Sequence, residues 1–168
     1  MTRDRSGHPE SILLDTKGTK AEKSTMNTKD TKESPHRTLL KPNAASYRVI
    51  GCALRVHTAK APGSLERAIA ECMHHEMKKS GLFVEDEVTI PLIYEDVRLP
   101  VGYRADFVVE KCLIVEIKCV KEVLPVHKAQ VLNYLRQADL KLGLLLNFNV
   151  AHMRNGIHRV INGPESEL

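Results

Sequence analysis

The sequence predicts one α/β domain in which helices flank a mixed four-stranded sheet. Two segments with helical spacing of apolar residues lie between residues 44 and 81, and three apolar or β-branched runs follow between residues 88 and 120. A further helical segment then precedes a last apolar run at residues 141–150. The order is therefore α-α-β-β-β-α-β, which favours a mixed sheet with helices on its faces.

Turn and capping residues mark the three expected helices. The first spans residues 44–59 and ends before an Ala-Pro-Gly break. Ser64 is predicted to cap the second helix, which Gly81 closes. The third spans residues 124–140 and carries Pro125 in its first turn, where a proline is tolerated.

Four strands are expected from runs of Val, Ile, Leu and Phe. The first three occupy residues 88–94, 98–110 and 112–120, and the fourth occupies residues 141–150. The continuous apolar character of the fourth predicts that it is buried on both faces. A short strand or turn around residues 156–161 is expected to end the fold.

Charge and composition divide the chain at about residue 42. Residues 1–42 hold nine Lys and Arg against six Asp and Glu, and the remainder holds sixteen against fifteen. We expect a disordered, charged tail over residues 1–42, a folded domain over residues 43–163 and a short tail over residues 164–168. Met26 is an alternative start. The nearly neutral domain argues against a broad basic surface for nonspecific nucleic-acid binding.

The expected location is the cytoplasm, without membrane association. No apolar run approaches the roughly 20 residues of a membrane span, and the N-terminus has no apolar signal segment. The four cysteines form no CxxC pair and match no zinc spacing, so buried free thiols are expected. An iron–sulfur protein is the alternative, and it predicts a brown preparation.

Three charged residues interrupt the most apolar part of the sequence: Asp106, Glu116 and Lys118. Glu116 and Lys118 are two apart on a strand and therefore share a face. A two-residue turn before that strand would pair Asp106 with Val115 and separate the acids. A three-residue loop at residues 110–112, or a bulge near Asp106, would bring the carboxylates together, and we expect one of these two devices.

A divalent cation would explain two carboxylates in a buried place. Half-buried carboxylates repel each other, and burying them is costly. Hard oxygen ligands suit Mg²⁺ or Mn²⁺, and the backbone carbonyl of Ile117 can add a ligand. Lys118 beside the ion could hold or activate a water for attack on a phosphodiester. The simpler alternative is an Asp–Lys or Glu–Lys ion pair at a sheet edge.

Six motifs follow one another over about residues 45–163: VIGCALRVH, PGSLE, GYRADFVVE, LIVEIKCV, LPVHKAQVLNYL and GLLLNFN. Together and in this order they resemble the GxxExxY family, within the PD-(D/E)XK nuclease superfamily. The resemblance implies a restriction-endonuclease-like core. The chain departs from the family at Ile69, where the name motif has tyrosine, and at PGSL and KAPG, which replace PGLL and LGPG.

The resemblance also implies roles for individual residues. Asp106 and Glu116 would be metal ligands, Lys118 the catalytic lysine, and Glu66 an acid that ligates directly or through water. Gln130 and Tyr134 match a QxxxY element that would orient Lys118 or contact a phosphate. The plainer alternatives are a first-turn acid for Glu66 and a helix-surface pair for Gln130 and Tyr134.

Arg104, two residues before Asp106, is a candidate phosphate ligand or a partner for an acid. The function expected from all these features is metal-dependent hydrolysis of phosphodiester bonds in DNA, in preference to RNA. The alternative is a non-catalytic module of the same fold that binds protein or nucleic acid, with a homodimer as its candidate assembly.

Overall fold

The structure is a computed structural model, and it describes residues 38–60 and 62–168. Most of the expected tail, together with Met26, lies outside these residues. The described elements are α1 (Pro42–Ala59), α2 (Glu66–Lys79), β1 (Val84–Tyr94), β2 (Val97–Val109), β3 (Leu113–Lys118), α3 (Pro125–Ala138), β4 (Leu142–Asn147) and β5 (Ile157–Ile161), with short 3₁₀ turns at Met153–Gly156 and Glu165–Glu167.

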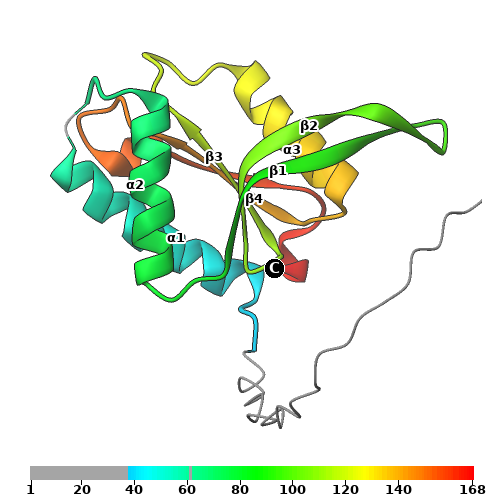
Figure 1. The fold of residues 1–168 in the computed structure, drawn as a ribbon, viewed down its shortest axis with the longest axis horizontal. Helices are drawn as coiled ribbons and strands as arrows, with labels where there is room; N and C mark the ends of the chain where they lie inside the picture. Colours follow the sequence, from blue (N-terminus) through cyan, green and yellow to red (C-terminus); the bar gives the residue numbers. More distant parts are fainter. Residues whose placement is uncertain (1–37, 61) are drawn as a thin grey trace, which may run out of the picture. The chain divides into compact units, whose positions relative to one another are not determined.

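The strands form one mixed sheet in the order β1-β2-β3-β4-β5 (Figure 1). The pairs β1–β2, β2–β3 and β4–β5 are antiparallel, whereas β3 and β4 are parallel and are joined through α3. A parallel pair needs such a crossover because its strands must start from the same edge. The predicted fold class, a mixed α/β sheet flanked by helices, is confirmed.

The predicted number of strands is wrong, because the sheet has five strands and not four. Ile157–Ile161 forms a full strand that pairs with β4 from Leu142↔Ile161 to Leu146↔Ile157. All six residues of β4 are buried. An exposed edge would leave the backbone groups of this apolar strand unpaired, and β5 covers that edge.

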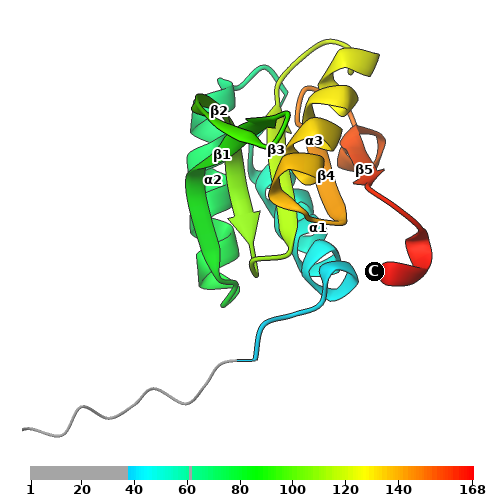
Figure 2. The same ribbon diagram turned by 90° about the vertical axis from the view of Figure 1, so that its right-hand side faces the viewer.

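Helices lie on both faces of the sheet (Figure 2), and an apolar core fills the space on each face. On one face α1 and α2 pack against alternate β3 residues, including Val115 and Ile117. On the other face α3 packs against Ile114 of β3 and Leu145 of β4. The alternation of side chains along β3 places Glu116 and Lys118 on the α3 face.

The starts of α2 and β1 are among the element boundaries that differ from the prediction. Leu65, not Ser64, precedes the first turn of α2, because Leu65 keeps an extended backbone (φ −65°, ψ 137°) and makes no side-chain cap. β1 begins at Val84, four residues earlier than expected, since Val84 and Glu85 pair with β2. The three consecutive acids at residues 85–87 do not have the apolar pattern of a strand, so the sequence did not predict this part of β1.

A buried acid joins three distant parts of the described chain. Glu110 is 1% exposed, and its carboxylate accepts hydrogen bonds from the backbone N–H groups of Phe83 (2.9 Å) and Leu40 (3.1 Å). The Cys112 thiol donates to the Leu40 carbonyl at 3.2 Å. The residues just before α1 are thus attached to the β2–β3 loop.

Among the described helices, none is both long and apolar enough to cross a lipid bilayer.

Candidate active site

The β2–β3 hairpin has the register that brings its acids together. Phe107 pairs with Val115 and Val109 with Leu113, which leaves a three-residue loop at residues 110–112. Glu110 and Lys111 adopt positive φ angles of 52° and 57° in this loop. Continued by one residue beyond these pairs, the same offset sets Asp106 opposite Glu116, and the charge of Asp106 acts on the Glu116 carboxyl. The prediction that a three-residue loop or a bulge unites the two carboxylates is confirmed, and the loop is the device used.

Asp106 connects the two strands through its side chain. Its Oδ2 accepts a hydrogen bond from the backbone N–H of Ile117 at 2.7 Å. Burial raises the pKa of Asp106, and the hydrogen bond from Ile117 and the charge of Lys118 only partly oppose this shift. Asp106 is therefore a half-buried acid fixed against the backbone of β3.

Glu116 and Lys118 form an ion pair in the interior of the sheet. Lys118 Nζ lies 2.7 Å from Glu116 Oε1, and the side chains are 14% and 4% exposed. The ion-pair alternative is therefore realised, but on the central strand β3 and not at a sheet edge. Within the described part of the chain, Glu116 Oε2 is buried and makes no hydrogen bond of ordinary geometry. The backbone N–H of Asp106 lies close enough to the Glu116 carboxylate to oppose the rise of its pKa.

The pKa values of this pair both shift upwards. Burial raises the pKa of Glu116, and the charge of Asp106 raises it further. Burial alone would lower the pKa of Lys118, but its hydrogen bond to Glu116 and the nearby carboxylates outweigh that effect and raise it. Lys118 is consequently an ammonium at neutral pH, and protonation of Glu116 is easier than for an exposed glutamate.

Glu66, the first residue of α2, reaches the end of β3. Its Oε2 accepts a hydrogen bond from the backbone N–H of Cys119 at 3.0 Å, and its Oε1 lies 3.9 Å from Lys118 Nζ. An acid in the first turn also suits the helix dipole, so both readings of Glu66 are compatible with its position. The structure places Glu66, Asp106, Glu116 and Lys118 in one charged cluster.

Gln130 and Tyr134 belong to the α3 side of this cluster. The Gln130 amide donates to the Tyr134 hydroxyl, and Tyr134 is only 3% exposed. Burial raises the Tyr134 pKa, and the charges of Glu116 and Asp106 act in the same direction. The interpretation as a helix-surface pair is wrong, because Tyr134 packs in the core and against Tyr103 at a ring distance of 5.3 Å.

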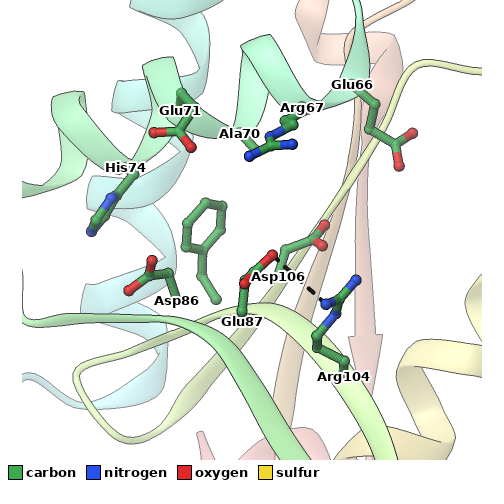
Figure 3. Close-up of a pocket in the computed structure, with 10 residues that line it drawn as sticks. Glu66, Arg67, Ala70, Glu71, His74, Asp86, Glu87, Arg104 and Asp106 are labelled. Carbon is green, nitrogen blue, oxygen red and sulfur yellow. Dashed lines mark ion pairs between the residues drawn. The ribbon is translucent and has the colours of Figure 1, made fainter.

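Arg104 lies on the wall of an open cleft between α2 and the β1–β2 hairpin. The cleft has a volume of about 630 Å³, and Asp106 and Glu66 also line it (Figure 3). Arg104 forms a long ion pair, 3.8 Å, with Glu87, and both side chains are largely exposed. Arg104 was expected to bind a phosphate or to pair with an acid. The acid that it pairs with is Glu87, which the sequence did not identify.

Asn147, which pairs with Lys118 on the neighbouring strand, holds the backbone that follows β3. Its side chain is 2% exposed and exchanges two hydrogen bonds with the backbone of Val120, at 3.1 Å and 2.9 Å. The backbone N–H of Phe148 donates to the Lys118 carbonyl at 2.8 Å. A polar amide at the end of an otherwise apolar strand indicates that its side chain bonds to the backbone of the turn that follows.

The donor atoms fit a divalent cation that keeps most of its water. Among the residues that the structure describes, no group of three or more His, Cys, Asp and Glu side chains is arranged to hold a metal ion. Mg²⁺, however, is commonly bound by only one or two carboxylates. Asp106 and Glu116 supply two hard carboxylates, and the buried Glu116 Oε2 lacks a partner in the described structure.

The chain was compared with known proteins and families. No curated protein and no solved structure matches it. A family described as the PD-(D/E)XK nuclease superfamily matches residues 43–160, which is more than half of the chain and includes the whole charged cluster. The chain therefore belongs to the PD-(D/E)XK nuclease superfamily.

Proposed function

We propose that this domain hydrolyses phosphodiester bonds in DNA, in preference to RNA, with the help of Mg²⁺ or Mn²⁺. The observation that carries the proposal is the meeting of Asp106, Glu116 and Lys118 on the β2–β3 hairpin, with one buried Glu116 oxygen unpartnered in the described structure. Membership of a nuclease superfamily supports nucleic acid as the substrate class, and such nucleases typically use divalent metals. The ordered motifs further support placement with the GxxExxY proteins.

Each residue of the cluster has a proposed role. Asp106, Glu116 and the Ile117 carbonyl would hold the cation, and Glu66 would contact it directly or through water. A bound cation polarises the phosphoryl oxygen and lowers the pKa of a water. The ammonium of Lys118 orients that water and stabilises negative charge. Its raised pKa disfavours a role for Lys118 as a neutral base.

The remaining predicted residues would contact the substrate. The half-buried Gln130 would contact a phosphate, and the hydroxyl of the almost fully buried Tyr134, which accepts from the Gln130 amide, would donate to a phosphate oxygen near Glu116. Arg104 can exchange its weak pairing with Glu87 for a phosphate. In the hydrolysis the water oxygen bonds to phosphorus and releases a proton to solvent, the bond from phosphorus to one sugar oxygen breaks, and that oxygen takes a proton from solvent.

Cleavage assays with Mg²⁺ or Mn²⁺ test the proposal. Asp106→Ala and Lys118→Ala are each expected to lower the rate on the order of 100-fold or more, since each removes a group that acts on the transition state. Glu122→Ala removes an exposed acid outside the cluster and is expected to match the wild type. Equal activity in the wild type and both cluster variants would refute the proposal.

A non-catalytic binding module is the second candidate, and one observation favours it. Asp106, Glu116 and Glu66 each already have a protein partner, namely Ile117, Lys118 and Cys119. Such a module could bind protein or nucleic acid as a homodimer. Calorimetric titration with Mn²⁺ separates the candidates, because an absence of binding heat and of any shift in melting temperature would favour the module.

We also propose a cytoplasmic location. All four cysteines are free, as is usual in a reducing compartment, and a preparation without brown colour would discard the iron–sulfur alternative.

A further inference from the structure

Charge is unevenly distributed along the cleft between α2 and the β1–β2 hairpin. One end holds Glu66, Asp106 and Arg104, next to the proposed cation site, and Arg67 points into the middle (Figure 3). The other end holds the exposed carboxylates of Glu71 and Asp86 and the half-buried imidazole of His74 (Figure 3). Among the described lining residues, that end has no lysine or arginine.

A polyanion would meet strong repulsion at this acidic end. Glu71 follows Glu66 by five residues on α2, so it lies about 7 Å further along the helix axis. A strand that continued past the reacting phosphate would set its next phosphates against the carboxylates of Glu71 and Asp86. Like charges brought together at a binding surface exclude a ligand, and such repulsion is a common source of specificity.

We propose that Glu71 and Asp86 close this end of the cleft to the phosphodiester backbone, so that the domain acts on strand ends and not on internal bonds. This inference rests on the proposed nuclease activity. The substrate is then a nucleic-acid strand with a free end, and the bond hydrolysed is one near that end. The products are mononucleotides or very short oligonucleotides.

Arg67 supplies the last cationic contact before the acidic end. It is exposed, it lines the cleft, and the described residues offer it no hydrogen bond or ion pair. Arg104 faces it from β2. Two guanidinium groups on opposite walls can bind the terminal phosphate from both sides, because each presents several N–H donors in a planar fork. Arg67 is thus assigned as a phosphate-binding residue.

Cleavage of linear and circular DNA tests the inference. A single-stranded oligonucleotide and its covalently closed circle, of the same sequence, are incubated with the full-length protein and Mn²⁺. We expect the linear form to be shortened from an end and the circle to react roughly 100-fold more slowly or not at all. Similar rates for both forms would overturn the inference while supporting the nuclease. Cleavage of neither form would overturn the proposed function, and the inference with it.

A variant without the two negative charges tests whether Glu71 and Asp86 cause the preference for strand ends. Glu71→Gln/Asp86→Asn removes both carboxylates from the acidic end, and both side chains are exposed, so folding is expected to be retained. This variant is expected to cleave circles. The matched control, Glu85→Gln/Glu122→Gln, removes two charges outside this cleft and is expected to cleave only the linear form. If the first variant cleaves linear DNA but still spares circles, Glu71 and Asp86 are not the barrier.

Discussion

The two oxygens of Glu116 have different surroundings, and this difference explains what the residue can bind. Oε1 accepts from Lys118, whereas Oε2 is buried and has no partner in the described structure. A buried acceptor without a partner costs about 1–3 kcal/mol. A cation at Oε2 would remove this cost and would also screen Glu116 from Asp106.

The affinity for Mn²⁺ is expected to depend on pH. Burial raises the pKa values of Asp106 and Glu116, so protons compete with the cation at pH values where an exposed carboxyl has already ionised. The affinity should rise as the pH increases through the raised pKa values and level off once both groups are ionised. Calorimetric titration from about pH 5 to about pH 8 measures this. A constant affinity over that range would contradict the assignment.

Without a cation, the same shifts are expected to reduce stability as the pH rises. An acid whose folded pKa is raised contributes stability below its unfolded pKa and loses it as the pH rises through the folded pKa. Glu116→Gln removes one such group. As the pH rises, the free energy of unfolding of this variant should therefore decrease less than that of the wild type. Urea unfolding at about pH 5 and about pH 7 provides the comparison. Parallel decreases would show that Glu116 does not titrate in this way.

At the scale of elements, the sequence predicted the order of helices and strands better than their geometry. Apolar periodicity located α1, α2, α3 and the buried β4, because burial imposes that pattern. It left residues 156–161 open between a short strand and a turn, since their pairing with β4 depends on contacts far along the chain. The polar start of β1 was missed for the same reason.

The sequence predicted only part of the candidate site. The motifs identified Asp106, Glu116 and Lys118, but two hairpin registers were possible, and only the pairing of Val109 with Leu113 decides between them. Glu87 and Arg67 were not predicted, because they enter the cleft from two elements whose packing no local pattern encodes. Glu87 also has a φ of 48°, which a strand pattern does not anticipate.

Gly156 is expected to be essential to the turn between β4 and β5. A Cβ at this position would overlap the backbone carbonyl of Asn147, the residue that ends β4 and holds Val120. Gly156→Ala should therefore lower the free energy of unfolding by about 1–3 kcal/mol and reduce cleavage. The control is Gly51→Ala in α1, where the nearest atom is the Arg55 guanidinium at 3.6 Å. Equal melting temperatures for the two variants would contradict this prediction.

For the whole molecule, a cation bound between Asp106 and Glu116 should stabilise the fold. These residues connect β2 to the central strand β3, against which α1, α2 and α3 all pack. At about 100 times its dissociation constant, a ligand of the native state adds about 2.7 kcal/mol. Mn²⁺ should raise the melting temperature of the wild type by several degrees and leave Asp106→Ala unchanged. Equal shifts in both proteins would indicate binding elsewhere.

The buried carboxylate of Glu110 sets a limit on how far the chain can be shortened. Leu40 supplies one of its hydrogen-bond donors, and Leu40 precedes both α1 and the first residue of the family match. A fragment that begins at residue 43 would deprive an almost inaccessible anion of that donor and admit solvent beside Cys112. Preparations intended for crystallisation should therefore begin no later than residue 38.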